Sequence, residues 1–527
     1  MSSELKISQD ARSGIERGIE KVVKAVAATL GPKGRNAVLD KSVVGGTCII
    51  TNDGVSIAKE IILKDPCENM GAQLMVEVAT RTNDTVGDGT TTSIVLAYAM
   101  IREGMKNLAA GANPIIMRRG MKKAAAQIIQ GLEKQAISVT KKEEITQIAT
   151  ISSGDYEIGK LIAEAMEKVS MEGFITLEDA KTRDTTLTII NGMRLKTGYL
   201  SRYMCNMKKE KKVEYHNPYI LITDQIINKI QMILPILEVV SQEKQELLIV
   251  AGDINGDAIT TLVLNDMKGI FSVVGVKAPG FGEFQKDILE DMAVMTGGIC
   301  FFKERGLELQ NASISMLGRA DKVIVDKENT LILGGHGNSD QVQIRVEHIK
   351  KMSKATESEF NKERYRERIS KLTKGIAVIQ IGADSEIELI EKKLRIEDAI
   401  AATKAAIAEG IVPGGGCAYL HAIKDLKIMA EGLDGDEKTG AFIILQALTA
   451  PCKQIAYNAG LDGAVITEKV MNMEKWMGFD ALLEQYSNLL EAGIIDPLRV
   501  VKAAFLNAES VASTLLTIEA VNIRNSL

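Results

Sequence analysis

The chain reads Thr-Val-Gly-Asp-Gly-Thr-Thr-Thr-Ser at residues 85–93. The glycines let backbone amides approach an anion closely, and the threonine hydroxyls add hydrogen-bond donors. A helix is predicted from about Thr90, and its unpaired N–H groups and positive dipole end favour a phosphate. Asp88 would repel that phosphate unless a divalent cation lay between them, so it is a candidate magnesium ligand. The alternative is an ordinary turn followed by a helix N-cap.

A second candidate acid, Asp53, lies in the segments before this stretch. Residues 38–40 and 48–51 are predicted to form a hairpin-like pair of short strands, followed by an Asn-Asp-Gly turn at residues 52–54. Asp53 thus stands between a strand and a helix, and a further helix predicted over residues 68–83 leads into the glycines. No Walker A sequence occurs in the chain, which disfavours ordinary P-loop enzymes.

The sequence pattern changes and then reverses along the chain. Residues 1–134 predict helices with one small sheet, beginning with a helix that has Asp10 as its N-cap and ends at Gly31. Residues 135–191 mix helices and strands, and residues 192–375 alternate buried strands with helices. Residues 376–409 return to the mixed pattern, and residues 410–527 are predicted to be helical to the end. We therefore expect a multi-domain α+β protein with two discontinuous domains nested around a continuous one.

The central region has two features that are open to two interpretations and one highly charged segment. The helices predicted over residues 230–241 and 257–267 carry more apolar residues than one buried face requires, so they are either buried on both sides or exposed as a binding surface. Tyr199 and Tyr203 raise the same question. Residues 348–371 are dense in both charges, which favours a solvated helix or helical pair.

Composition narrows the class of protein. The chain has 527 residues, enough for roughly three domains, and 46% of them are hydrophobic. Its net charge of -5 gives no general attraction to nucleic acid or to a membrane surface. Six scattered cysteines without a C-x-x-C pair predict reduced, mostly buried thiols and no zinc site. No signal or transit peptide and no apolar run long enough to span a membrane is found, so we expect a cytoplasmic protein.

Three acids could act together in phosphoryl transfer. Hydrolysis of a phosphoanhydride needs a metal, a phosphate cradle and a carboxylate that orients water. Asp88 and the glycines supply the first two, and Asp53 and Asp398 are candidates for the third. Taken alone, the surroundings of Asp398 are more typical of a solvated helix residue. The three glycines at residues 414–416 could admit a nucleotide or form a plain loop.

Five motifs together resemble the GroEL-type, group I chaperonins. They are Thr-Leu-Gly-Pro-Lys-Gly-Arg-Asn at 29–36, Glu-Asn-Met-Gly-Ala-Gln at 68–73, Gly-Asp-Gly-Thr-Thr-Thr at 87–92, Val-Lys-Ala-Pro-Gly-Phe-Gly at 276–282 and Val-Pro-Gly-Gly-Gly at 412–416. The resemblance extends in order to about Val521. It implies an equatorial ATPase domain (1–134 and 410–527), an intermediate hinge domain (135–191 and 376–409) and an apical domain that binds substrate and co-chaperonin (192–375).

The resemblance also implies roles for individual residues. Asp88 would hold Mg²⁺, with K⁺ as a further candidate ion, and Asp53 and Asp398 would be catalytic by orienting the attacking water. The remaining ATP-binding residues would be Thr29, Leu30, Gly31, Pro32, Gly89, Thr90, Thr91, Thr92, Ile151, Gly415, Asp480, Ala481 and Asp496. The residues that bind substrate and co-chaperonin would be Tyr199, Tyr203, Met204, Leu234, Leu237, Ile259, Val263 and Leu264.

The implied function is an ATPase that folds proteins and takes part in stress responses. The implied partners are further copies of the chain in two stacked seven-membered rings, a GroES-type co-chaperonin and non-native polypeptides, with no nucleic acid and no membrane. The implied location is a bacterial cytoplasm, or the stroma or matrix of an organelle. The alternative is a diverged paralogue that mainly holds clients and cycles ATP weakly, whereas a small-molecule kinase is disfavoured because no second substrate pocket is evident.

Four departures from the family pattern identify a diverged member. Asn52 replaces the usual lysine, Thr197 replaces an arginine that commonly makes an inter-subunit ion pair, and Asp480 replaces an asparagine that usually meets the base. The chain ends at residues 524–527 without the Gly-Met-rich tail of many relatives. These departures bear on ATP affinity and cooperativity rather than on the fold.

Overall fold

The computed structural model describes residues 3–40, 48–139, 141–169, 174–180, 182–208 and 210–524. The chain divides into two compact units. The first unit comprises Met1–Glu164, Asp179–Thr186 and Ile381–Leu527, and the second comprises Ala165–Glu178 and Leu187–Gln380. The nested, discontinuous order of the chain is therefore present, while the finer division into three domains stays a prediction. The end of the chain, where no Gly-Met-rich tail was found, lies beyond the described residues.

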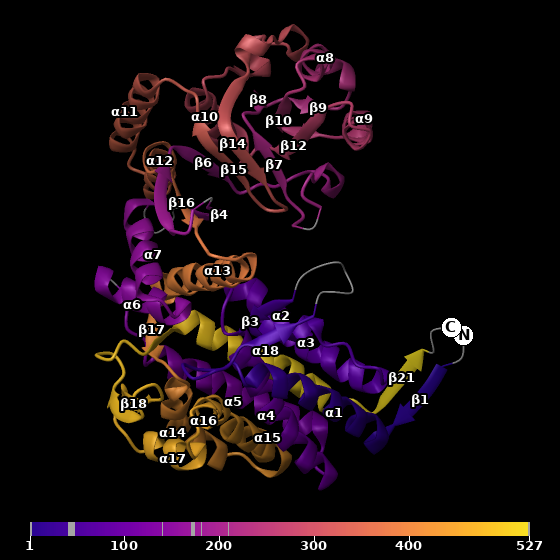
Figure 1. Cartoon of the computed structure of the whole chain (residues 1–527), viewed down its shortest axis with the longest axis vertical. Coiled ribbons are helices and arrows are strands. Elements are labelled where there is room, and N and C mark those ends of the chain that lie inside the picture. Colours follow the sequence, from indigo (N-terminus) through magenta and orange to yellow (C-terminus); the bar gives the residue numbers. More distant parts are fainter. Residues whose placement is uncertain are drawn as a thin grey trace. The chain divides into compact units, whose positions relative to one another are not determined.

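Helices form most of the first unit (Figure 1). They are α1 (Ser8–Ala27), α2 (Gly54–Glu60), α3 (Pro66–Val86), α4 (Thr90–Ala109), α5 (Pro114–Glu133), α6 (Lys142–Ser153), α13 (Glu386–Glu409), α14 (Cys417–Glu431), α15 (Gly435–Ala447), α16 (Ala450–Asn458), α17 (Gly463–Met471) and α18 (Leu498–Leu515). Helix α7 (Tyr156–Val169) begins in this unit. The apolar stripes of α1, α3, α4, α5 and α18 meet in one core, so both ends of the chain build it together.

Short antiparallel strand pairs join distant parts of this unit. They are β1 (Ser3–Ile7) with β21 (Ala520–Arg524), β2 (Ala37–Leu39) with β3 (Ile49–Thr51), β17 (Ile411–Pro413) with β20 (Ile495–Pro497), and β18 (Met477–Asp480) with β19 (Gln485–Asn488). The predicted hairpin-like pair before Asp53 is confirmed. The prediction that the chain is helical from residue 410 to the end is wrong, because strands too short to show a clear alternation pair across the chain.

The first helix starts earlier than predicted. Its N-cap is Ile7, not Asp10, and Asp10 lies within the first turn of α1. A carboxylate there still interacts favourably with the positive end of the helix. Likewise α13 starts at Glu386, about nine residues before the predicted start, because Ser385 caps it by accepting from the Glu388 amide.

The second unit is built on an eight-stranded mixed sheet with the order β12-β10-β8-β14-β15-β6, in which β13 also pairs with β8 and β7 with β14. The bounds are β6 (Gly192–Leu195), β7 (Val213–His216), β8 (Tyr219–Thr223), β10 (Glu246–Ala251), β12 (Ser272–Lys277), β13 (Cys300–Phe301), β14 (Gly318–Val325) and β15 (Thr330–Gly335). Strands β8, β10 and β12 are parallel. All five residues of β8 are buried, as the continuous apolar run predicts.

Several further elements of the second unit lie outside that sheet. They are β9 (Ile226–Ile227), which pairs with β11 (Asp253–Ile254), the short 3-10 turn η2 (Arg202–Met204), α8 (Leu234–Gln242), α9 (Gly256–Met267), α10 (Gly282–Thr296), α11 (Ser339–Ala355) and α12 (Glu359–Thr373). A separate three-stranded sheet has the order β4 (Ile175–Asp179), β16 (Ile376–Ile381), β5 (Thr186–Ile190).

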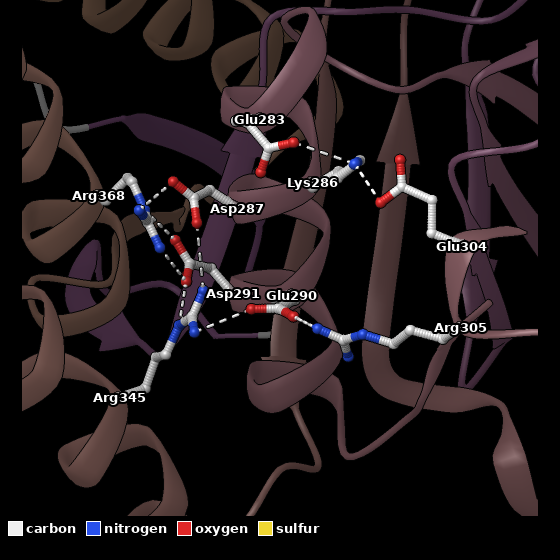
Figure 2. Close-up of polar contacts among 9 residues, drawn as sticks. All are labelled: Glu283, Lys286, Asp287, Glu290, Asp291, Glu304, Arg305, Arg345 and Arg368. Atoms are coloured by element: carbon white, nitrogen blue, oxygen red, sulfur yellow. Dashed lines mark hydrogen bonds and ion pairs between the residues drawn. The ribbon is translucent and has the colours of Figure 1, made fainter. Parts of the chain in front are cut away.

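A buried ion-pair network fastens the charged helical pair, α11 and α12, to α10. Figure 2 shows Asp291 of α10 between the guanidinium groups of Arg345 and Arg368. Arg368 Nε lies 2.7 Å from Asp291 Oδ2, and Arg345 Nε lies 2.7 Å from Asp291 Oδ1. Arg368 and Asp291 are each only 2% exposed. The helical pair predicted here is confirmed. Arg345 and Arg368 face α10 rather than solvent, which a charge run on a helix cannot show by itself.

Candidate functional site

The Gly-Asp-Gly stretch forms a tight turn between two long helices of the first unit. Helix α3 ends at Val86 and is capped by Gly87, whose N–H donates to Asn83 O at 2.8 Å, and α4 begins after Gly89. Both glycines have positive φ angles, 71° and 77°, which glycine adopts without strain. A Cβ at Gly87 would lie 2.6 Å from the Cβ of Ala401 on α13. The turn therefore presents the N-terminus of α4 and is closely approached by α13.

Asp53 lies beside this turn as the N-cap of α2. Its carboxylate accepts from the Val55 amide at 3.2 Å and the Ser56 amide at 3.0 Å. The Thr90 hydroxyl donates to Asp53 Oδ1 at 3.5 Å. Asp53 lies between β3 and α2, as the sequence predicted, and its hydrogen bond from Thr90 places it beside the first turn of α4.

Asp88 points into the same shielded space. Its Oδ1 accepts from the Gly89 amide at 2.5 Å, and its Oδ2 accepts from Ser152 Oγ at 3.4 Å. Burial raises the pKa of Asp88 above its ordinary value, although both hydrogen bonds oppose the shift, and the Asp53 carboxylate raises it further. A carboxylate in this setting gains from a cation.

Asp398, on α13, interacts with Asp53 and Asp88. Burial raises its pKa well above the ordinary value, and the charges of Asp88 and Asp53 act in the same direction. Helix α13 contacts α3 and β3, the elements that lead into Asp88 and Asp53. Tertiary structure thus places three acids from distant parts of the sequence together, and the interpretation of Asp398 as a solvated residue is disfavoured.

Asp496 of β20 is a fourth acid in the group formed by Asp53, Asp88 and Asp398. Burial, and then the charge of Asp88, raise its pKa to about 7, while a hydrogen bond from the Gly415 amide opposes the shift. Pairing of Val412 with Asp496 in the β17–β20 ladder sets this contact. Gly415 has a φ of 63°. The glycine loop at residues 414–416 is therefore held to the Asp496 carboxylate by the Gly415 amide.

The four carboxylates suit a site that shares a metal with a phosphate ligand. Like charges in a shielded space raise one another's pKa, and a bound cation relieves that repulsion. Across the described parts of the chain, no three His, Cys, Asp or Glu side chains are spaced to hold a metal by themselves. Magnesium commonly takes one or two carboxylates together with substrate phosphates and waters. Asp88 fits such a partial ligand set.

The other residues predicted to bind nucleotide lie in the first unit, on the loop after α1, the start of α4, the end of α6 and the β18–β19 hairpin. Thr29 is buried, whereas Gly31 and Pro32 are exposed at the end of α1. An ion pair between Lys33 and Glu484 joins this loop to the β18–β19 hairpin, which carries the buried Asp480 and Ala481. Leu30, Gly89, Thr91 and Thr92 are half-buried, and Ile151 is exposed.

Asn52, Thr197 and Asp480, the three residues that depart from the family pattern, lie in different surroundings. Asp480 Oδ1 accepts from the amides of Leu482 and Leu483 at 2.8 and 3.0 Å, so this carboxylate fixes the turn of the hairpin. Asn52 is exposed beside Asp53. Thr197 Oγ1 is buried and has no hydrogen-bond partner among the described residues.

Sequence reasoning missed two polar residues that support the site. Ser152 donates to Asp88 from the end of α6, and its only signal was its place next to Ile151. Asn458 donates to Ala27 O and Leu30 O, more than 400 residues away in the chain. No local pattern marks such a contact.

The predicted substrate-binding residues lie in the second unit on η2, α8, α9 and the preceding loop. Tyr203 is 62% exposed and Leu264 51%, and Leu234 is also exposed. Tyr199, Ile259 and Val263 are half-buried. Met204 and Leu237 are buried in the core of this unit. Helix α9 contacts η2, so the exposed Tyr203 and Leu264 lie on adjoining elements, and Leu234 lies on α8.

The described residues contain no helix that is both long enough and apolar enough to cross a membrane. The model of the TCP-1/cpn60 chaperonin family matches residues 22–525. The match covers nearly the whole chain and spans both compact units.

Proposed function

The chain belongs to the TCP-1/cpn60 chaperonin family, and we propose that it is an ATP-dependent chaperonin of the GroEL type. Chaperones of protein folding make up this family, and its members are generally ATPases. The group I assignment rests on the Lys-Ala-Pro-Gly-Phe-Gly segment at residues 277–282. The proposal adds that this chain hydrolyses ATP and encloses its clients.

One observation carries the ATPase proposal: Asp53, Asp88, Asp398 and Asp496 converge on the turn before α4 within one compact unit. The helix N-terminus and the positive-φ glycines suit a phosphate. The raised pKa values of Asp88, Asp398 and Asp496 mark a shielded group of acids, which is typical of a functional site.

Asp88, Asp53 and Asp398 would have different roles in ATP hydrolysis. Asp88 would hold Mg²⁺, which when bound neutralises phosphate charge. Asp53 is kept in place by its two backbone hydrogen bonds, and Asp398 stands on α13 facing both acids. Asp398 is the proposed water-orienting base, because a carboxylate whose pKa is raised above its ordinary value is a stronger proton acceptor when ionised. The loop at Thr29–Pro32 and the Asp480 hairpin would bind the rest of the nucleotide.

Clients would bind to the apolar surface of the second unit. Tyr203, Leu234 and Leu264 are the exposed members of the predicted set, and exposed apolar side chains bind the apolar segments of unfolded chains with little specificity. A GroES-type co-chaperonin would compete for this surface. Assembly into two stacked seven-membered rings and a bacterial cytoplasmic location complete the proposal.

The decisive test is Asp398→Ala. Steady-state ATP turnover should fall by about a hundredfold or more, because general base catalysis commonly contributes that much. ATP binding, measured by calorimetry, should persist. The matched control is Glu397→Gln, an exposed neighbour on the same helix, and it should retain turnover. Full turnover in Asp398→Ala would refute the assigned role.

A holdase with weak ATP cycling is the second candidate, and Asp480 favours it. A carboxylate has no N–H to donate to a base, and its Oδ1 is already occupied by the hairpin turn. Refolding of a denatured client with ATP and a GroES-type partner supports the folding chaperonin. Suppression of aggregation without refolding supports the holdase.

A further inference from the structure

The loop after α1 is held by one side chain from the C-terminal part of the chain. Asn458, the last residue of α16, donates from Nδ2 to Ala27 O at 2.9 Å and to Leu30 O at 2.8 Å. Its Oδ1 accepts from Gln454 Nε2 at 2.8 Å. Both amide hydrogens and the amide oxygen are therefore used, and a flipped amide would place its oxygen against two carbonyl oxygens. Gln454 thus fixes the orientation of the Asn458 amide.

These contacts stabilise a tight backbone turn. The last carbonyls of α1 have no partners within the helix. Leu30 N–H donates to Ala27 O at 3.2 Å, and Gly34 N–H donates to Gly31 O at 2.9 Å. Gly31 has a φ of 87°, and a Cβ there would lie 3.0 Å from Ile455 Cγ2. Helix α16 therefore supports the loop through one polar residue and one apolar residue.

The direction of the Leu30 carbonyl decides what the loop presents. In a trans peptide group the C=O and N–H point in opposite directions. Because Asn458 holds Leu30 O toward α16, the Gly31 N–H points away from α16, on a loop where Gly31 and Pro32 are exposed. We propose that Asn458, oriented by Gln454, is a positioning residue that fixes the Leu30–Pro32 loop in its nucleotide-binding conformation. This role rests on the nucleotide site proposed above.

The test replaces the donor by an acceptor of the same shape. Asn458→Asp places a carboxylate against two carbonyl oxygens, so the KM and the dissociation constant for ATP should rise about tenfold. The kcat at saturating ATP should stay within about twofold, because the catalytic acids are not touched. Gln454→Leu should raise the KM by about threefold, since it only releases the amide orientation. The matched control is Asn472→Asp on the exposed C-terminus of α17, which should change neither constant.

Hydrogen exchange of the nucleotide-free protein provides a second readout. The Leu30, Gly34 and Arg35 amides should exchange faster in Asn458→Asp and Gln454→Leu than in the control. Unchanged loop exchange and an unchanged KM in folded variants would overturn the proposal, as would a loss confined to kcat. If the unaltered protein binds no ATP, the proposed function fails while loop exchange still tests the positioning role. If Asn458→Asp does not fold, Gln454→Leu and Asn458→Ala decide the matter by both readouts.

Discussion

We expect single side chains to change the affinity of the nucleotide site for ATP through the hydrogen bonds that they can donate. Asp480 fixes the β18–β19 turn with one oxygen, a role that an asparagine oxygen fills equally well. Asp480→Asn should therefore keep the turn and add an N–H donor for the base. We expect the dissociation constant of ATP to fall about fivefold, equivalent to about 1 kcal/mol, as measured by calorimetry.

The matched control for Asp480→Asn is Asp462→Asn. Asp462 caps α17 by accepting from the Ala464 and Val465 amides, so it makes the same kind of bond away from the site. The affinity for ATP should not change in this control. An equal gain in both variants, or weaker binding in Asp480→Asn, would contradict the role given to residue 480.

Asp496 makes the stability of the nucleotide-free protein depend on pH. Its pKa is raised to about 7 in the fold, so the folded state holds a proton that the unfolded state releases near pH 4. The stabilisation is complete below about pH 4 and is lost as the pH rises through 7. Asp496→Asn should therefore add about 4 kcal/mol to the free energy of unfolding at pH 8 and little at pH 4.

Urea unfolding of the magnesium-free protein at the two pH values measures this difference. A stabilisation of the same size at pH 4 and pH 8 would show that Asp496 is not the group that titrates. Asp425→Asn on the same unit serves as the control for a general change in charge.

At the scale of elements, the position of a helix is set by a few buried contacts. Helix α12 has a weak apolar stripe and a highly charged sequence, yet Arg368 ties it to Asp291 of α10 with two hydrogen bonds at 2.7 and 3.0 Å. Removal of one partner from a buried ion pair leaves an uncompensated charge. The attachment of α11 and α12 therefore depends on this network more than on apolar packing.

Arg368→Met should loosen α12. Breaking a buried pair costs about 3 kcal/mol, which corresponds to about a hundredfold faster amide exchange in this helix. Arg366→Met is the matched control, because Arg366 is 65% exposed and pairs with Glu363 one turn away. Exposed pairs of this kind contribute about 0.3 kcal/mol. Exchange rates measured by mass spectrometry should separate the two variants, and similar rates would contradict a structural role for the network.

At the scale of the whole molecule, the two proposed activities belong to different compact units. The acids lie in the first unit and the apolar surface in the second. The double variant Tyr203→Ser, Leu264→Ser should weaken the capture of a denatured client about tenfold while its basal ATP turnover stays within about twofold. Asp398→Ala should show the reverse pattern. Aggregation suppression and phosphate release are the two measurements.

The control for client capture is Ile428→Ser, an exposed apolar residue on α14 of the first unit. Its loss should leave capture unchanged. If Ile428→Ser weakened capture as much as the double variant, exposed apolar area anywhere on the chain would account for binding, and the surface on η2 and α9 would have no special role.

The sequence alone determined the local structure and the candidate chemistry. The start of a helix at Thr90, the place of Asp53 between a strand and a helix, and the buried strand β8 each depend on neighbouring residues, and each lies where its pattern predicted. The order of the motifs also indicated the family. Short strand pairs such as β17–β20 were missed, because their partners are far apart in the chain and each strand has only three residues.

Only tertiary structure decided which residues meet. Asp398 had the same local pattern as a solvated helix residue, and Arg368 the same as its exposed neighbour Arg366. Their burial comes from packing between helices that are distant in sequence. Asn458 gave no local signal at all, because its partners are the carbonyls of Ala27 and Leu30. Desolvation and charge repulsion depend on such distant neighbours, so the pKa values that mark the site arise only in the folded chain.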